Sequence, residues 1–379
     1  MPGRERATIL FTTKYGREPE GLVRSPGRIN LIGDHTDYTG GLVLPTAIDR
    51  AVWVAFRPRS DRIVRLRSEA FVDDVLIDLD GLARSQGWGE YVKGVAWALE
   101  QSGNRLMGWE GVITSDVAMA AGLSSSGALT VAIVAVFSQV ADLGWDPASF
   151  AEIVQRAENE WVGVHSGIMD PLVTTAARKG YAMLIDCRDL DTSHIPIPPD
   201  AAFVVMDTGT RRNLLEAGYN RVRSQCEAAA GALGCSSLRD LTSQQFPSFE
   251  GAIDQPLLRC ARHVVTENER TLAAADALAA GRLVELGRLM SESHISLRDL
   301  LGVSSRPLDA IVQSAQSATG CYGARLTGGG YAGAAIALVD RSLTEGFITD
   351  VEDGFHDATG LQGHCYVVES APGISFEQV

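Results

Sequence analysis

Residues 26–41 read PGRINLIGDHTDYTGG, and this stretch decides how the rest of the chain is interpreted. It places a guanidinium, carboxylates, an imidazole and an amide between glycines that let the backbone turn tightly. The candidate functional residues here are Arg28, Asn30, Asp34, His35 and Asp37. The flanking segments INLI and LVLPTAI are apolar, so we expect a polar loop held between two buried segments. A polar set this dense is atypical of a core, and the alternative interpretation is a solvated hairpin loop.

A second turn, GLSSSGAL at residues 122–129, separates a strand-like segment from a long apolar run that predicts a buried helix. Small residues let backbone N–H groups approach a phosphate, and a helix N-terminus carries partial positive charge. Serine hydroxyls can also bond phosphate oxygens or Mg²⁺. No Walker A lysine follows, so this turn is not a P-loop. The alternative is a serine-rich helix cap that binds no ligand.

Length and charge limit the class of protein. A chain of 379 residues exceeds the usual size of one hydrophobic core, so two domains are expected. We place the boundary at the proline-rich bend HIPIPPD, which gives domains of residues 1–193 and 194–379.

A net charge of −14 without a large basic cluster argues against nucleic acid as a partner. No apolar run approaches the length of about eighteen residues that a membrane helix needs, and no signal peptide is evident. The sequence therefore predicts a cytoplasmic protein with no membrane partner.

Two segments between the serine turn and the bend carry acids of interest, AENEWVG at residues 157–163 and GIMD at residues 167–170. Mg²⁺ prefers one or two carboxylates together with phosphate oxygens and water, so an acid near the serine turn is the expected complement. Glu158 lies on a helix with an apolar stripe, where a lone acid is normally solvated. We expect this helix to end in a loop that carries Asp170.

GRINLIGDHTDYTGG resembles the sugar-recognition motif GRVNLIGEHTDYNGG of galactokinases, within the GHMP kinase superfamily. GLSSSGAL is similar to the GLSSSAAL phosphate loop of that superfamily, and LTGGGYAG at residues 326–333 is similar to its MTGGGFGG motif. The resemblance implies an α+β, two-domain GHMP kinase fold with the active site in the cleft between the domains. It also implies an enzyme that uses ATP and Mg²⁺ to phosphorylate the C1 hydroxyl of a monosaccharide.

The same resemblance implies roles for individual residues. AENEWVG resembles AENxFVG, whose first glutamate binds Mg²⁺, so Ser126 and Glu158 are the candidate metal ligands. GIMD resembles GIMDQ, which makes Asp170 the candidate general base and Arg28 its partner that stabilises negative charge. Whether Asp170 removes the proton or only orients the hydroxyl stays open. The residues implied in nucleotide binding are Trp88, Gly122, Leu123, Ser124, Ser125 and Ser126. The residues implied in sugar binding are Arg28, Asp34, His35, Asp37, Gly167, Asp170 and Tyr219.

Two further features of the sequence allow other functional interpretations. Gly328, Gly330 and Gly333 satisfy G-x-G-x-x-G, but AAIALV after them reads as a strand and not as the helix that a dinucleotide site needs. A glycine turn between two strands, or beside the phosphate loop, fits better. His263 and His294 lie in a stretch that is helical by period, and we expect locally bonded histidines that serve structure.

Asp34 stands where the family has a glutamate that contacts the hydroxyl at C6. An aspartate is one methylene shorter, so its carboxylate withdraws by about 1.5 Å. Galactose or a galacto-configured sugar is the expected substrate. The alternatives are a C6-modified sugar, such as an octose of lincosamide antibiotic biosynthesis, or L-arabinose. A non-catalytic galactokinase-like sugar sensor is a further alternative, which the full-length serine loop and the presence of Asp170 disfavour.

Overall fold

The computed structural model describes residues 1–118, 121–211 and 215–378. Its largest sheet has six strands in the order β13-β1-β3-β6-β4-β5. These strands are β1 (Gly21–Asn30), β3 (Pro45–Pro58), β4 (Ile63–Ser68), β5 (Val75–Asp78), β6 (Trp109–Ser115) and β13 (Ser375–Gln378). The residues after the opening motif alternate and are β-branched, and they form strands that continue its sheet.

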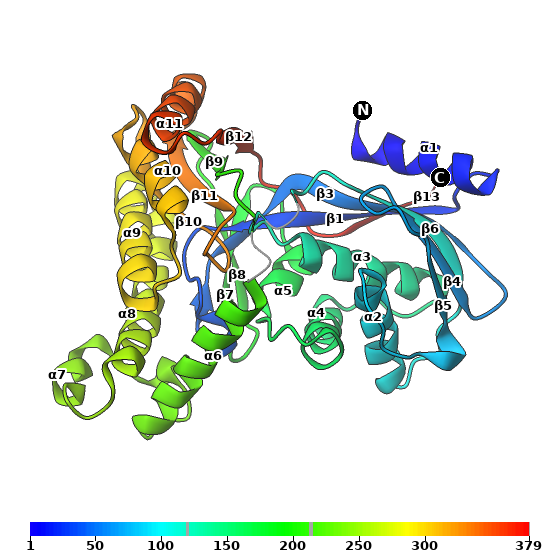
Figure 1. Ribbon diagram of the computed structural model, residues 1–379, viewed down its shortest axis with the longest axis horizontal. Helices are drawn as coiled ribbons and strands as arrows, with labels where there is room; N and C mark the ends of the chain where they lie inside the picture. Colours follow the sequence, from blue (N-terminus) through cyan, green and yellow to red (C-terminus); the bar gives the residue numbers. More distant parts are fainter. Residues whose placement is uncertain (119–120, 212–214, 379) are drawn as a thin grey trace.

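Helices cover both faces of this sheet (Figure 1). The helix on one face is α1 (Gly3–Tyr15), and those on the other are α2 (Gly89–Gln101), α3 (Ser125–Val140), α4 (Pro147–Arg156) and α5 (Met169–Ala176). Helix α3 is buried along most of its length, as its apolar sequence predicts. A core cluster packs Val131 and Phe137 of this helix against Val54 and Trp109 of the sheet. The packing holds the serine-rich N-terminus of α3 at a fixed place beside β1.

The second half of the chain builds a four-stranded sheet in the order β10-β11-β9-β12. Its strands are β9 (Ala201–Asp207), β10 (Cys321–Leu326), β11 (Ala334–Asp340) and β12 (His364–Val368). The helices around it are α6 (Leu215–Ala232), α7 (Phe246–Phe249), α8 (Gln255–Ala279), α9 (Leu283–Ser296), α10 (Arg306–Ser317) and α11 (Thr344–Thr359). The sequence predicts that the helix α6 starts at Arg211, but residues 212–214 lie outside the described part of the chain.

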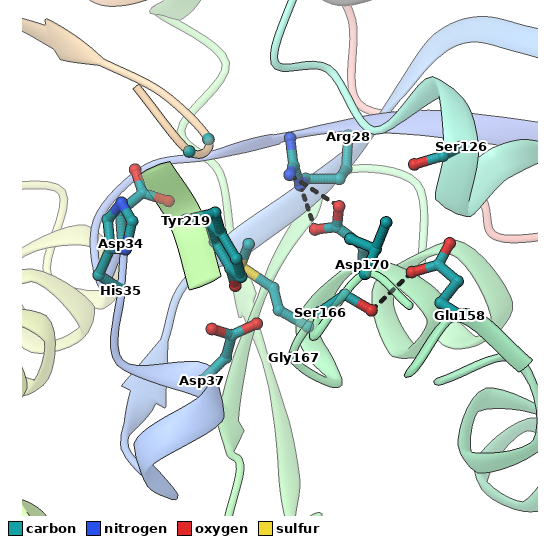
Figure 2. A pocket seen from close by; sticks show the side chains of 14 residues that line it. Arg28, Asp34, His35, Asp37, Ser126, Glu158, Ser166, Gly167, Asp170 and Tyr219 are labelled. Carbon is teal, nitrogen blue, oxygen red and sulfur yellow. Dashed lines mark hydrogen bonds and ion pairs between the residues drawn. The ribbon is translucent and has the colours of Figure 1, made fainter. Parts of the chain in front are cut away.

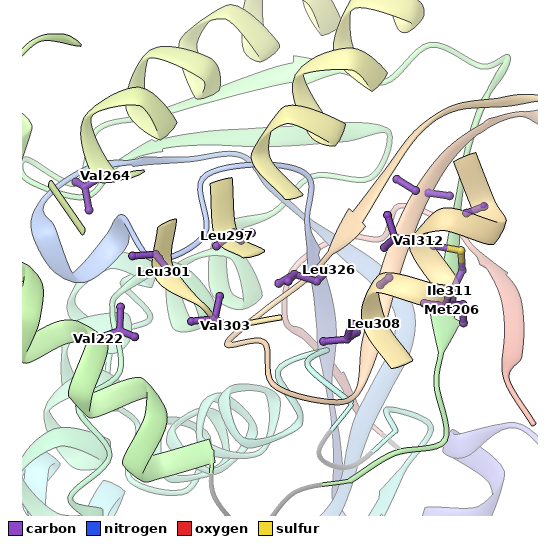
Figure 3. Close-up of a cluster of buried hydrophobic side chains, with 14 of the residues drawn as sticks. Met206, Val222, Val264, Leu297, Leu301, Val303, Leu308, Ile311, Val312 and Leu326 are labelled. Atoms are coloured by element: carbon purple, nitrogen blue, oxygen red, sulfur yellow. The ribbon is translucent and has the colours of Figure 1, made fainter. Parts of the chain in front are cut away.

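The core of this half lies between the four-stranded sheet and its helices. Figure 3 shows Met206 of β9 and Leu326 of β10 in one cluster with Leu297, Leu301 and Ile311 from the helical side. The stretch predicted to be helical forms α8, α9 and a short π-helix (Leu297–Leu301). Gly281 and Gly302 adopt positive φ where the helices end, a conformation that glycine tolerates without strain.

A small third sheet, in the order β2-β7-β8, lies between the other two. Its strands are β2 (Leu42–Val43), β7 (Tyr181–Asp186) and β8 (Thr192–Pro196). One core cluster joins Ile29 and Leu31 of the opening motif to Phe203 and Ile336 of the four-stranded sheet. The C-terminal strand β13 returns to pair with β1. The domain boundary at residue 193 stays a prediction. Within the described residues, no helix has the length and apolar character needed to cross a membrane.

Candidate active site

Arg28 lies where the pairing of β1 with β3 is irregular. The register shifts between Pro26 and Arg28, where one residue of β1 lies opposite three residues of β3, so the extra residues are on β3. The backbone N–H of Arg28 donates to the carbonyl oxygen of Leu123 at 3.1 Å, in the serine turn. The guanidinium donates through Nε to Asp170 Oδ1 at 2.7 Å and through Nη2 to Asp170 Oδ2 at 2.9 Å (Figure 2). Arg28 therefore connects the opening motif to the serine turn and to the GIMD segment.

Asp170 lies in the first turn of α5, and our expectation that a loop carries it is wrong. Pro171 follows it, which the first turn of a helix tolerates because its N–H groups have no intrahelical partner. The side chain of Arg28 is 5% exposed, whereas that of Asp170 is 26% exposed. The pair is thus closed on the arginine side and open on the carboxylate side, where a substrate hydroxyl can reach it.

The loop after β1 is buried, contrary to the expectation that so polar a set lies outside the core. Asn30, Asp34 and His35 are 0%, 2% and 4% exposed. The Asp34 carboxylate accepts a hydrogen bond from Asn30 Nδ2 at 2.9 Å and forms an ion pair with Arg325 of β10. Burial raises the pKa of Asp34, and Arg325 and Asn30 oppose that rise. Pairing across the two halves of the chain is what lets these charges occupy a buried loop.

Three rings form one wall beside this loop. Nδ1 of His35 lies 2.8 Å from the hydroxyl oxygen of Tyr38. The ring of Tyr219, from α6, lies 5.4 Å from each of the His35 and Tyr38 rings, measured between centroids. Burial lowers the pKa of His35 to about 3, so the imidazole is neutral at pH 7. The wall therefore offers polar edges without adding positive charge.

The carboxylate of Asp37 packs directly against Gly167, and both residues line the pocket. A Cβ at Gly167 would lie 1.8 Å from Asp37 Oδ2, so no other residue fits there without displacing the carboxylate. Asp37 Oδ1 accepts a hydrogen bond from the backbone N–H of Tyr38 at 2.9 Å. Burial, followed by the nearby charge of Asp170, raises the pKa of Asp37 to about 7. Among the described residues Asp37 has no ion-pair partner, so a carboxylate without a paired cation lies next to the Arg28–Asp170 pair.

The serine turn and the glycine turn pack on each other. Strands β10 and β11 are antiparallel and are joined by the glycine turn, so the dinucleotide-binding interpretation is excluded and the predicted turn is confirmed. A Cβ at Gly328 would lie 2.8 Å from the carbonyl oxygen of Gly122, and both glycines have positive φ. Ser124 adopts a left-handed conformation before α3, and its buried hydroxyl has no hydrogen-bond partner among the described residues. The turn therefore presents a free hydroxyl and the N–H groups of a helix N-terminus.

Glu158 lies in a π-helical turn (Ala157–Val162), a distortion that is frequent at functional sites. Its Oε2 accepts a hydrogen bond from Ser166 Oγ at 2.6 Å, and its Oε1 accepts one from Thr130 Oγ1 at 3.3 Å. Burial raises the pKa of Glu158 to about 7, and Ser166 opposes that rise. Figure 2 shows the carboxylate pointing to the same part of the pocket as the hydroxyl of Ser126. The buried position of Glu158 contradicts the solvated face that is usual for a lone acid.

One pocket of about 190 Å³ brings the residues predicted for sugar and metal together. These are Arg28, Asp34, His35, Asp37, Ser126, Glu158, Gly167, Asp170 and Tyr219. The remaining lining residues, which the sequence interpretation missed, are Val164, Ser166, Met169, Gly328 and Gly329. Ser166 directly precedes the GIMD segment, Met169 lies within it, and the two glycines lie within the LTGGGYAG segment. Their positions in or next to these motifs could have indicated that they line the pocket.

The residues predicted for the nucleotide divide into two groups. Gly122, Leu123, Ser124 and Ser125 form the turn into α3, next to Ser126 in the pocket. Trp88, which precedes α2, does not line this pocket and instead stacks on Phe71 with ring centroids 5.6 Å apart.

His263 and His294 are bonded over long distances in the sequence, so the expectation of local bonding is wrong. The ring nitrogens of His263 lie 2.8 Å from Ser296 Oγ and 3.0 Å from the carbonyl oxygen of Asp34. Nδ1 of His294 accepts a hydrogen bond from the backbone N–H of Leu326 at 3.3 Å. Neither residue lines the pocket. Burial lowers the pKa of each to about 4, so both are neutral at pH 7 and serve as structural supports.

Comparison with known proteins gives the same order of motifs. Residues 9–58 match the galactokinase galactose-binding signature, residues 90–178 the GHMP kinases N terminal domain, and residues 274–351 the GHMP kinases C terminal domain. A galactokinase of Roseiflexus sp. (strain RS-1) is 45% identical over 370 residues, which cover 96% of this chain and 95% of that protein. The chain belongs to the galactokinase family. A second member, from Chloroflexus aurantiacus (strain ATCC 29366 / DSM 635 / J-10-fl), is 44% identical over 372 residues, with 96% and 95% covered.

The solved structures agree with this membership. The crystal structure of Lactococcus lactis galactokinase complexed with galactose superimposes with a TM-score of 0.94 at 34% identity, covering 97% of this chain and 98% of that one. The Methanococcus jannaschii mevalonate kinase, at 15% identity and a TM-score of 0.64 over 92% and 98% of the two chains, shares the fold alone. The predicted GHMP kinase fold is confirmed, and galactokinase family membership makes the chain an ATP-dependent sugar kinase.

Proposed function

We propose that this chain transfers the γ-phosphoryl group of ATP to the C1 hydroxyl of galactose or of a galacto-configured sugar. The observation that carries the proposal is the bidentate Arg28–Asp170 pair, which lies between the sugar loop and the serine turn. Membership of the galactokinase family supports the choice of sugar. The Lactococcus lactis galactokinase that superimposes on this chain holds galactose.

Asp170 is the residue proposed to contact the reacting hydroxyl, as general base or as the group that orients it. Phosphoryl transfer passes through a loose transition state, so positioning and charge stabilisation supply most of the catalysis. Arg28 is fixed by Asp170 and by the carbonyl oxygen of Gly122, which its Nη1 approaches at 2.5 Å. The guanidinium therefore holds the carboxylate still and places positive charge between the sugar and the phosphate turn.

The serine turn fits a nucleotide, and its edge fits Mg²⁺. The hydroxyl of Ser124, which has no hydrogen-bond partner in the part of the chain that the structure describes, and the N-terminus of α3 are donors that a phosphate group would accept from. Ser126 and Glu158 are the proposed metal ligands, and Mg²⁺ supplies charge neutralisation of the transferred phosphate. Among the described residues no group of three or more His, Cys, Asp or Glu could hold a metal ion. The remaining ligands would therefore be phosphate oxygens and water. Trp88 is the proposed neighbour of the adenine.

The other end of the pocket is proposed to grip the sugar. Asp34, His35, Asp37, Gly167 and Tyr219 line it with oxygen acceptors and aromatic edges, which suit a ring of hydroxyl groups. Asp34 is proposed to meet the C6 hydroxyl. Its carboxylate is shorter than a glutamate and is paired with Arg325, so the place where this pair holds it decides which groups at C6 are accepted.

The test is ATP consumption with a panel of free sugars varied at C2, C4 and C6, followed by NMR to locate the phosphate. Turnover with galactose and phosphate on C1 is expected, and phosphate on another carbon would contradict the proposal. A companion variant, Asp34→Glu, is expected to narrow the range toward galactose because its carboxylate reaches further. An unchanged range would remove this position from C6 selection.

A further inference from the structure

Arg325 is a fully buried arginine that no family resemblance or pocket wall singles out. It lies near the end of β10, two residues before Thr327 and the glycine turn, and it is 0% exposed. A guanidinium is costly to bury without partners, so the groups that contact it indicate its role.

Both terminal nitrogens of Arg325 contact one distant loop. Nη1 donates to the carbonyl oxygen of Leu31 at 3.1 Å, and Nη2 pairs with Oδ2 of Asp34, 291 residues away in the sequence. Asp34 lines the pocket and Arg325 does not. Arg325 therefore acts on the pocket through the Asp34 carboxylate, as a positioning residue.

The backbone around Asp34 is held separately, by α8. Glu267 Oε1 accepts the backbone N–H of Gly33 at 3.0 Å, and His263 Nε2 lies 3.0 Å from the carbonyl oxygen of Asp34. Neither bond involves Arg325. Loss of the guanidinium should therefore release the carboxylate of Asp34 while its backbone stays anchored.

Asp34 lies at the end of the pocket away from the reaction centre. Figure 2 shows Asp34 and His35 on one side, and Asp170 with Ser126 and Glu158 on the other. Each carboxylate oxygen of Asp34 has one protein donor, from Asn30 or from Arg325, and can accept a further hydrogen bond. A hydroxyl bound there contributes to recognition without entering the chemistry.

We propose that Arg325 determines which sugars are accepted. It does so by holding the Asp34 carboxylate in position to bond the C6 hydroxyl, which lies far from the reacting C1 hydroxyl. This inference rests on the proposed function and adds a selecting residue from the second half of the chain. Since Asn30 and Arg325 fix the carboxylate before the sugar binds, a sugar without that hydroxyl loses a charge-assisted hydrogen bond. Such a loss lowers affinity by about tenfold or more.

The test compares Arg325→Met and Arg325→Lys with the unmodified chain. The sugars are galactose, 6-deoxygalactose and L-arabinose, of which the last two lack the C6 hydroxyl. For Arg325→Met, the KM for galactose is expected to rise about tenfold or more. Its kcat, and the KM for ATP and for the two other sugars, are expected to stay within about twofold, since none depends on the Asp34 contact. Arg325→Lys keeps the positive charge but loses the two-pronged geometry of the guanidinium. Its KM for galactose should therefore lie between that of the unmodified chain and that of Arg325→Met.

Two further variants separate positioning from general stability. Arg62 also bridges a carboxylate and a main-chain carbonyl, Glu100 at 2.7 Å and Leu106 at 2.5 Å, away from the pocket. Arg62→Met should lower the thermal unfolding temperature while leaving the sugar preference unchanged. The double variant with Asp34→Asn and Arg325→Met should match Arg325→Met alone in sugar preference, because both changes remove the same contact.

Equal losses for galactose and 6-deoxygalactose in Arg325→Met, or a loss in kcat alone, would overturn the inference. If thermal unfolding shows that Arg325→Met does not fold, Arg325→Lys decides, and an unchanged preference for galactose in it overturns the inference. If the unmodified chain phosphorylates none of the three sugars, the proposed function fails. Calorimetric binding of galactose and 6-deoxygalactose then tests Arg325 by itself, with the same expected ratio.

Discussion

The two ends of the pocket are held together in different ways. At the sugar end, the backbone N–H of Gly33 donates to Glu267 and that of Leu42 to Asn268, across separations of 234 and 226 residues. At the phosphate end, the hydroxyl donors to Glu158 come from residues 28 and 8 positions away. The sugar end is therefore assembled by both halves of the chain, and the side chains of the phosphate end mainly by the first.

This difference indicates where each end acquires its final geometry. The sugar loop is buried and is held by hydrogen bonds within the protein, which lowers the entropic cost of ordering it on binding. The phosphate end keeps a buried hydroxyl without a partner among the described residues, on Ser124, and Glu158 has a pKa raised to about 7 by burial. Under the proposed function, the sugar would meet side chains that contacts within the protein already position, whereas ATP and Mg²⁺ would supply partners to the groups of the phosphate end.

The largest effect on activity is expected at Asp170, which lies between the sugar end and the phosphate end of the pocket. Asp170→Asn keeps the shape of the side chain but loses the charge and the basic oxygen, so kcat should fall by about 10³-fold or more. ATP binding, measured by calorimetry, should be unchanged, because Asp170 is not part of the serine turn. Asp191→Asn, at an exposed position, is the matched control. Turnover near that of the unmodified chain would remove Asp170 from the mechanism.

The next effect tests the phosphate end alone. Glu158→Gln removes the charge proposed to bind Mg²⁺ and should lower kcat at least about tenfold while shifting the Mg²⁺ dependence to higher concentration. Galactose binding without ATP, measured by calorimetry, should be unaffected. Glu160 is exposed on the same π-helix, and Glu160→Gln is the matched control. An equal loss of galactose affinity in Glu158→Gln would show that the two ends are not independent.

A third prediction concerns the support of the sugar end. Although burial alone would raise the pKa of Glu267, Arg270 and Arg325 lower it to about 2, against an ordinary value of 4.5. Its stabilising contribution is therefore present above pH 4.5 and is lost as the pH falls toward 2. Glu267→Gln should lower the free energy of unfolding at pH 7 on the order of 3 kcal/mol and raise the KM for galactose.

Denaturant unfolding at several pH values checks this prediction. The deficit of Glu267→Gln should shrink as the pH falls from 5 to about 2, since the unmodified chain then loses the same contribution. Glu269 is exposed on the same helix, and Glu269→Gln should show no such trend. A deficit that does not change with pH would mean that the hydrogen bonds of Glu267, and not its charge, support the loop.

The sequence predicts the residues of both ends, but it predicts the backbone of the phosphate end better than the burial of the sugar loop, because the first depends on local patterns and the second on contacts between distant segments. The serine turn, its following helix and the glycine turn are local patterns, and the structure forms them where they were expected. The burial of Asp34 depends on Arg325, whose position follows from strand pairing far along the chain. Local patterning contains no information about such a partner, so the sequence predicts a polar loop between two buried segments and not that the loop itself is buried.

Other differences have the same origin. The sequence analysis expects a loop at Asp170, yet Met169–Ala176 forms α5, and Pro171 is tolerated in the first turn of that helix. His263 bonds the carbonyl oxygen of Asp34 because α8 docks on the opening loop. The available signal for Arg325 was a single charge within an apolar strand next to the glycine turn. The roles of the individual pocket residues stay predictions until variants are measured.

The smallest expected effect concerns Asp37, which has no ion-pair partner among the described residues, in contrast to the paired carboxylates of Asp34 and Asp170. Burial and the nearby Asp170 raise the pKa of Asp37 from 3.8 to about 7, so its charged form destabilises the fold. This cost is absent below pH 3.8 and complete above about pH 7, and partial exposure of Asp37 reduces it by solvent screening to about 2 kcal/mol. Asp37→Asn should therefore raise the thermal unfolding temperature at pH 8 and not at pH 4, while galactose binds more weakly. The exposed control Asp189→Asn should do neither. A variant that is less stable at pH 8 would mean that Asp37, like Asp34, has a stabilising partner at the sugar end.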